Sequence, residues 1–256
     1  ALNALTFLAS ALGLRTLRQP EPEPPTRAAD HHWRRDLPTG WRFLLAHPTL
    51  GPLFWNAMLF GAMIMASSPL MLVLMLRDLG LEPWQYGLAL GLPCVGGIAG
   101  AALAPWLERR AQRPERVLVV LGAVRTVWLL PMAFAPPGTT GLLVLIACDT
   151  AMLLCAGAFN PLFVAHRMAQ IPDHLMARAS SAWSITNRVV QPIAMLLAGL
   201  LAAATSTRWA IAIVGVGLIA SCALLPWRRL WSGADHPPPT AAGAGATLRQ
   251  ERPSPE

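Results

Sequence analysis

Three ionisable side chains lie inside long apolar stretches of this 256-residue sequence: Arg125, Asp149 and Arg188. An ionisable group near the centre of a membrane costs roughly 3 kcal/mol or more, so one that persists there predicts a function. Counting residues from the ends of the stretches places all three near the midplane. A carboxylate with an adjustable charge partner can be protonated in one state and ionised in another, as proton coupling requires. We predict that Asp149 handles protons with Arg188 or Arg125 as partner; a structural ion pair is the alternative.

Helical spacing places further polar side chains on shared faces. Asn160 follows Asp149 by eleven residues and lies on the same face of its helix. Ser67 follows Asn56 at the same interval. A third face comprises Ser180, Ser181, Ser184, Asn187, Arg188 and Gln191. Because lipid could not satisfy such faces, we expect them to line a wet interior, although a buried Asn can simply bond a neighbouring helix. The candidate cavity-lining residues are Asn56, Ser67, Asn160, Ser184, Asn187 and Gln191.

Six apolar stretches are long enough to cross a membrane, which takes about 20 helical residues. They are Leu50–Leu76, Trp84–Leu107, Val117–Ala135, Gly141–Ala165, Ala179–Ala204 and Trp209–Trp227. None alternates with a period of two, which argues against strands. The predicted fold class is therefore an all-α integral membrane protein with a bundle of six transmembrane helices.

The distribution of positive charge predicts the orientation of these helices. The chain is 54% hydrophobic and 13% charged, and all 20 of its basic residues are arginine. All but four of the arginines lie on one side of the stretches: Arg77 and Arg208 lie on the other side, and Arg125 and Arg188 lie within the stretches. The positive-inside rule makes the arginine-rich side cytoplasmic. We therefore expect a lipid bilayer as partner and no nucleic acid, and the Ala- and Pro-rich composition indicates a bacterial cytoplasmic membrane.

Four regions are predicted along the chain. Residues 1–14 are expected to be the end of a truncated transmembrane helix, and 15–49 a cytoplasmic linker. Within the linker Leu37, Trp41, Leu44 and Leu45 form the apolar face of a short helix expected at the membrane surface. Residues 50–227 form the six-helix transmembrane domain. Residues 228–256 are predicted to be a disordered cytoplasmic tail.

Small residues and prolines within the stretches predict close packing or bending. Two pairs, Gly87 with Gly91 and Gly96 with Gly100, allow close helix approach, as fixed packing or as a sliding interface. The first five stretches contain Pro69, Pro93, Pro131, Pro161 and Pro192, which are either simple kinks or bending points of a protein that changes shape.

No motif for nucleotide binding or hydrolysis is present, and no histidine or cysteine shows metal-ligand spacing. His166 and His174 are expected in a solvated connection. The sequence therefore predicts no cofactor, no metal site and no enzymatic activity.

Three stretches resemble the major facilitator superfamily, in particular its bacterial drug- and siderophore-exporter branch, which includes macrolide-efflux and enterobactin-exporter proteins. They are LTFLASALGLR at residues 5–15, GWRFLLAHP at residues 40–48, and residues 100–116. In the last stretch Glu108, Arg109 and Arg110 stand where the superfamily loop G-x-x-x-D-R-x-G-R-R has its Asp-Arg, and the loop glycine is absent. The resemblance covers residues 1 to about 230.

This resemblance implies two six-helix halves that rock about a central site, with this chain as the C-terminal half. It implies that the helices carrying Asn56, Ser67, Asp149 and Asn160 face the cavity. The helix at Trp84–Leu107 and the helix with the polar stripe at 180–191 are implied to face the missing N-terminal half. The predicted function is proton-driven export of a small hydrophobic or amphipathic molecule. The alternatives are a six-helix ABC permease subunit and a non-transporting membrane scaffold or sensor.

Overall fold

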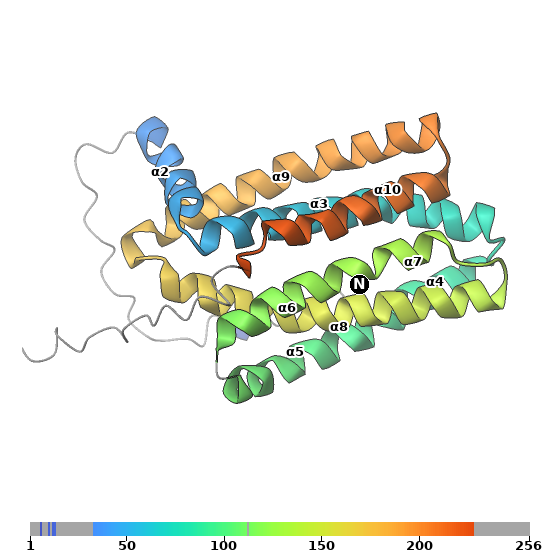
Figure 1. Cartoon of the computed structure of the whole chain (residues 1–256), viewed down its shortest axis with the longest axis horizontal. Helices are drawn as coiled ribbons and strands as arrows, with labels where there is room; N and C mark the ends of the chain where they lie inside the picture. Colours follow the sequence, from blue (N-terminus) through green and yellow to red (C-terminus); the bar gives the residue numbers. More distant parts are fainter. Residues whose placement is uncertain (1–5, 7–9, 11, 14–32, 112, 228–256) are drawn as a thin grey trace, which may run out of the picture. The chain divides into compact units, whose positions relative to one another are not determined.

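A computed structural model describes residues 6, 10, 12–13, 33–111 and 113–227 of the chain (Figure 1). The chain divides into two units, residues 1–36 and 37–256. In the first unit the described Thr6, Ser10, Leu12 and Gly13 are helical. Most of the predicted truncated helix, the linker at 15–32 and the tail at 228–256 lie outside the described residues, so those predictions remain as stated.

The second unit contains six helical spans long and apolar enough to cross a membrane, which confirms the predicted fold class. The first three spans consist of two helical segments each: α3 (Leu50–Val73) with the π-helix η1 (Leu74–Asp78), α4 (Pro83–Gly91) with α5 (Pro93–Arg110), and α6 (Pro114–Val127) with α7 (Leu129–Ala133). They are followed by α8 (Thr139–Gln170), α9 (Asp173–Ala204), and α10 (Thr207–Ala220) with the 3₁₀ turn η2 (Ser221–Leu224). The described part of the chain contains no strand.

The inner ends of α8 and α9 extend beyond the predicted boundaries. The sequence predicted a loop over residues 166–178, but only Ile171 and Pro172 separate the two helices. Polar residues lower the hydropathy of these ends without breaking the helix, so a search for apolar length stops too early. His166 and His174 are consequently helical rather than part of a loop.

Two of the five prolines coincide with breaks in their spans. Pro93 is the first residue of α5, and Pro131 lies just after the junction of α6 and α7 at Trp128. A proline ring clashes with the carbonyl four residues earlier. For Pro131 that residue is Val127, where α6 ends. Pro161 and Pro192 instead lie inside continuous helices, so a break is not a general consequence of these prolines.

Close packing within the second unit joins α8 to α5 and α6, and α3 to α9 and α10 (Figure 1). The α5–α8 contact is made through glycines: a Cβ on Gly96 would lie 2.6 Å from the Thr150 carbonyl oxygen, and one on Gly100 would collide with the Leu154 carbonyl. The second predicted glycine pair is therefore a close helix contact. Gly87 has nothing within 4 Å of its Cβ position, and the same is true of the other glycine of its pair.

The short helix α2 (Trp33–Ala46) lies where the sequence predicted a short amphipathic helix, and its place at the membrane surface remains a prediction. Within the second unit Leu44 is only 1% exposed, and Gly40 packs directly on the backbone of Arg178 in α9. The Trp41 indole nitrogen donates a hydrogen bond to Thr186 Oγ1 at 2.9 Å. The apolar face was located correctly, but protein covers much of it, because a residue without a Cβ at position 40 lets the backbones approach. Leu45 alone among these positions remains 47% exposed, and the side chain at 37 lies outside the described ones.

Candidate functional site

Arg125 on α6 lies at the centre of the packed helices and is only 2% exposed. Its guanidinium stacks between two aromatic rings, 3.7 Å from the ring centre of Phe159 on α8 and 4.1 Å from that of Phe60 on α3. Its Nη2 donates a hydrogen bond to Asn56 Oδ1 at 3.0 Å. Its Nε is buried without a hydrogen-bond partner. Aromatic faces stabilise a desolvated cation, so this arginine is held by rings and an amide.

Asn56 extends this contact to the C-terminal end of the bundle. The side chain is completely buried, and its amide nitrogen donates to the Ser221 carbonyl at 3.3 Å and to Ser221 Oγ at 3.2 Å. The Ser221 hydroxyl in turn donates to the Leu218 carbonyl at 2.6 Å. Arg125, Asn56 and Ser221 therefore form one buried polar network that joins α6, α3 and η2.

This network corrects the predicted pairing of Arg125 with Asp149. The guanidinium lies against Phe159, which follows Asp149 by ten residues on α8. Ten helical residues correspond to about 15 Å along the axis. Residue counting placed the two backbones at similar depth, but the direction of a long arginine side chain depends on the packing around it.

Asp149 is half-buried, on the same face of α8 as the exposed Asn160. Across the residues that the structure describes, the Asp149 carboxylate forms no hydrogen bond or ion pair, so the predicted pairing with Arg188 is also absent. Arg188 itself is exposed on α9. The proposed proton role of the three charged residues remains a prediction, now without a charge partner for Asp149.

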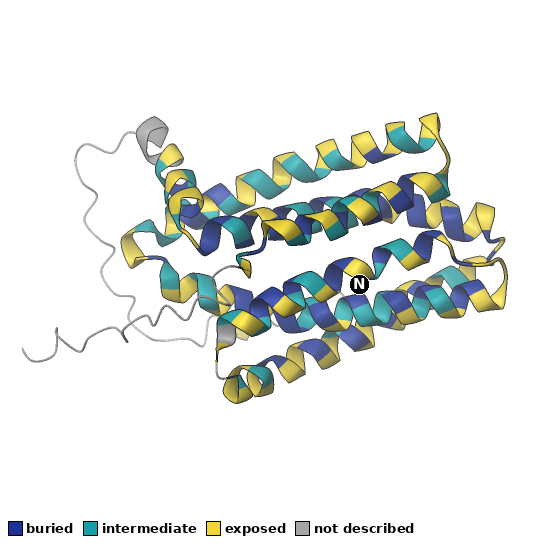
Figure 2. Ribbon diagram, viewed as in Figure 1, coloured by how far each residue is buried: buried dark blue, intermediate teal, exposed yellow. Residues whose placement is uncertain are grey.

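The polar stripe of α9 lies at the edge of the bundle. Ser184 is exposed, whereas Asn187 and Gln191 are half-buried and hydrogen-bonded to each other at 3.5 Å. These two amides lie over Gly61 of α3, where a Cβ would be 3.6–3.8 Å from them. In an apolar 18-residue segment of α9 only 6% of the residues are buried, against 28–44% in the corresponding segments of the other five spans. Figure 2 shows α9 with few buried residues.

Two of the candidate cavity-lining residues are instead enclosed by protein. Asn56 belongs to the buried network, and Ser67 is 3% exposed with its hydroxyl donating to the Ile64 carbonyl at 2.9 Å. Neither side chain opens onto a cavity here, because helix packing satisfies each of them. The candidates Asn160, Ser184, Asn187 and Gln191 do reach the surface or its edge.

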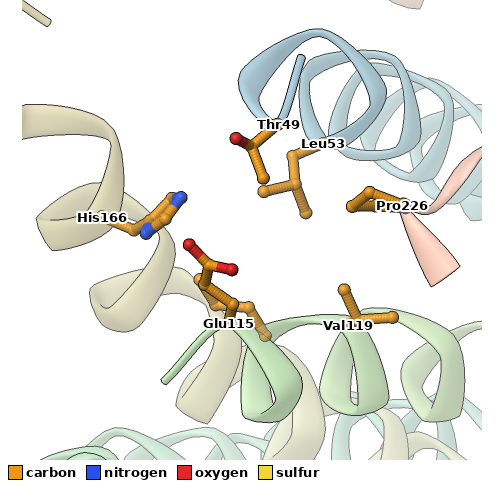
Figure 3. Close-up of a pocket in the computed structure, with 7 residues that line it drawn as sticks. Thr49, Leu53, Glu115, Val119, His166 and Pro226 are labelled. Carbon is orange, nitrogen blue, oxygen red and sulfur yellow. The ribbon is translucent and has the colours of Figure 1, made fainter. Parts of the chain in front are cut away.

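A pocket that sequence reasoning missed lies where α6 begins, α8 ends and α3 begins (Figure 3). Glu115, His166 and Thr49 line it, together with the apolar Leu53, Leu118, Val119 and Pro226. His166 follows the buried Phe163 and Leu162 by three and four residues. That spacing continues the buried face of α8 and could have located His166 against protein. No group of three potential metal ligands occurs among the residues that the structure describes.

The family model of the Major Facilitator Superfamily matches residues 1–190. The chain belongs to this superfamily. No curated protein matches it at a significant level. Membership makes the chain a multi-pass membrane protein of a transporter family, in agreement with its six spans. The ABC permease alternative is therefore set aside.

The superfamily-like stretch at residues 100–116 ends α5 and begins α6. Glu108, Arg109 and Arg110 are all exposed in the last turn of α5, and the Arg110 guanidinium lies 5.4 Å from the ring centre of Trp106. In the described part of the chain none of the three forms an ion pair. Their grouping at one helix end agrees with the sequence, and their role in this superfamily member remains a prediction.

Proposed function

We propose that this chain is the C-terminal six-helix half of a proton-driven exporter in the drug- and siderophore-exporter branch of the superfamily. Its substrate is a small hydrophobic or amphipathic molecule. The observation that carries the proposal is the half-buried Asp149 carboxylate, which has no partner among the described residues and lies deep in a membrane-crossing helix.

The depth of Asp149 gives the carboxylate a reason to bind and release a proton. It follows Thr139, the first residue of α8, by ten positions, or about 15 Å, which is half of a hydrocarbon core about 30 Å thick. An ionised carboxylate at that depth is costly unless water or a cation reaches it. Protonation of Asp149 therefore accompanies the exclusion of water from its carboxylate, and release of the proton accompanies the return of water.

The two least buried spans support the assignment to one half of a larger transporter. They are α9, with 6% of its apolar window buried, and the α4–α5 span, with 28%. The resemblance assigns these same two helices to the contact with the other half. Both also carry exposed apolar side chains, including Leu196 and Leu197 on α9 and Ile98 on α5. The N-terminal half is the partner that covers them and completes the central cavity.

The proposal also includes the orientation of the six spans in the membrane. Arg109, Arg110, Arg113 and Arg116 are exposed at the end of the bundle where α5 meets α6. The positive-inside rule places this arginine-rich end in the cytoplasm of a bacterial cell, with the spans in the plasma membrane.

Ethidium, a fluorescent amphipathic cation, is a suitable first probe of export. Cells expressing the full-length gene product are expected to accumulate less ethidium than control cells, and a protonophore is expected to remove the difference. Asp149→Asn should abolish export, whereas Asp149→Glu, which keeps an ionisable group, should retain part of it. The matched control is Asp173→Asn, because Asp173 is exposed in the first turn of α9.

Export by Asp149→Asn at the wild-type level would contradict the proton role. If Asp149→Asn reduced only the amount of folded protein, and the wild type lowered the accumulation of no probe in a panel of hydrophobic dyes, the scaffold alternative would be favoured. Protein abundance in the membrane must therefore be measured for every variant.

A further inference from the structure

His166 and Glu115 face each other across the pocket at the arginine-rich end of the bundle (Figure 3). The Glu115 carboxylate points toward the His166 ring, and the Thr49 hydroxyl faces the same space. The pocket is small, with a cavity volume of about 10 Å³, and it is partly open to solvent. Three helices meet here: His166 lies near the end of α8, Glu115 in the first turn of α6, and Thr49 directly before α3.

One polar atom at this pocket has no hydrogen-bond partner in the described part of the chain. His166 Nε2 is buried and forms no hydrogen bond. A buried polar atom without a partner costs about 1–3 kcal/mol, so native proteins rarely keep one without a reason. The neighbouring Arg167 donates no hydrogen bond to His166 Nε2. Its guanidinium instead lies over the ring of Trp183, 4.9 Å from the ring centre.

Among the described residues, Glu115 and His47 are the titratable groups that act electrostatically on the imidazole. Glu115 faces the ring from α6 and favours its positive form, whereas His47, in the turn before α3, disfavours a second positive charge nearby. His47 uses its Nδ1 to accept hydrogen bonds from the backbone nitrogens of Thr49 and Leu50, at 3.4 and 3.2 Å. The remaining lining of the pocket from α3, α6 and the segment after η2 is apolar. Of the residues that the structure describes, Glu115 is therefore the acidic group that can neutralise a positive imidazole.

We propose that His166 and Glu115 form a proton-binding site, in which one proton taken up by the imidazole creates an ion pair that ties the end of α8 to the start of α6. The ring is neutral at high pH and faces the carboxylate without bonding to it. After proton uptake the ring has two N–H donors, and the formerly unpartnered Nε2 can donate to the Glu115 carboxylate across the pocket. Low dielectric around the apolar lining strengthens this attraction. The site is separate from Asp149 and does not rest on the proposed export function.

The test is a double-mutant cycle on the thermal unfolding of the purified full-length protein in detergent. The variants are His166→Gln, Glu115→Gln and the double variant, each measured at about pH 5 and about pH 8. The lower value is chosen because burial lowers the pKa of His166. At the lower pH each single variant is expected to lower the melting temperature, and the double variant to lower it no further. The coupling should correspond to about a tenfold change in the unfolding equilibrium. At the higher pH the coupling should vanish, because the ring is no longer charged.

A second measurement does not depend on the stability of the double variant. In histidine-labelled protein, the ring resonance absent from His166→Gln reports the charge of His166 directly. The pH midpoint of that resonance is expected to move to lower pH in Glu115→Gln, where the attracting carboxylate is lost. The exposed His174 and Glu108 provide matched controls, since His174→Gln and Glu108→Gln should change neither reading.

Additive effects of the two substitutions at both pH values would overturn the proposal, as would a His166 midpoint that Glu115→Gln leaves unchanged. Loss of stability that is the same at both pH values would show that the two side chains only fill space. None of these outcomes depends on transport, so failure here is distinguishable from failure of the export proposal.

Discussion

Replacement of Arg125 by methionine tests whether this buried cation is held by Asn56 and aromatic rings or by Asp149. Methionine keeps much of the apolar volume between Phe60 and Phe159 and removes the charge together with its unpartnered Nε. The hydrogen bond to Asn56 Oδ1 is lost, which leaves a buried acceptor unsatisfied. We expect Arg125→Met to lower the free energy of unfolding by about 1–3 kcal/mol.

Arg125→Lys should be more damaging than Arg125→Met, although it preserves the charge. An ammonium group is more strongly hydrated than a guanidinium and lacks the planar face that stacks on Phe159. A buried charge that has lost its contacts costs about 3–5 kcal/mol. The order of the two variants therefore distinguishes an arginine held by aromatic faces from one kept only for its charge.

The assay is a pair of double-mutant cycles on unfolding in detergent, followed by tryptophan fluorescence. Arg125→Met combined with Asn56→Ala should show a coupling of about 1–3 kcal/mol, because the two residues share a hydrogen bond. Arg125→Met combined with Asp149→Asn should be additive. Coupling to Asp149 and none to Asn56 would refute this reasoning and restore the ion pair expected from the sequence.

Two further predictions concern helix packing and are also read from thermal unfolding. Gly100→Ala should lower the melting temperature, because the new methyl group would collide with the Leu154 carbonyl, whereas Gly87→Ala, with open space at its Cβ position, should not lower it. Trp41→Phe should cost about 0.5–1.5 kcal/mol through loss of the hydrogen bond to Thr186. Adding Thr186→Val to Trp41→Phe should then cost little more, and an independent second loss would contradict the assigned contact.

The spans could be predicted from the sequence because membrane crossing demands apolar length, and that demand acts on each segment separately. What lies against each span depends on other segments. The pattern of α2 located an apolar face correctly, yet lipid and protein impose the same periodicity on a helix. That Leu44 is buried by protein and that Trp41 donates to Thr186 could therefore not be predicted from the pattern alone.

The contacts of the polar residues also depend on other segments of the chain. An asparagine in an apolar helix is equally compatible with a wet cavity and with a bond to a neighbouring helix, and Asn56 proved to be the second. The sequence located Arg125 and Asp149 in depth but could not give the direction of the arginine side chain. His166 was missed for a related reason, since hydropathy ended the helix before the residue that continues its buried face.

The glycine contacts between α5 and α8 have a mechanical consequence. Thr150, the residue after Asp149, lies directly against Gly96, where the threonine carbonyl and its methyl group both contact the glycine. A rigid displacement of α8 near Asp149 therefore moves α5 with it. Arg110 lies fourteen residues beyond Gly96, about 21 Å along the helix. A small tilt at the depth of the carboxylate becomes a larger sweep of the arginine-rich tip.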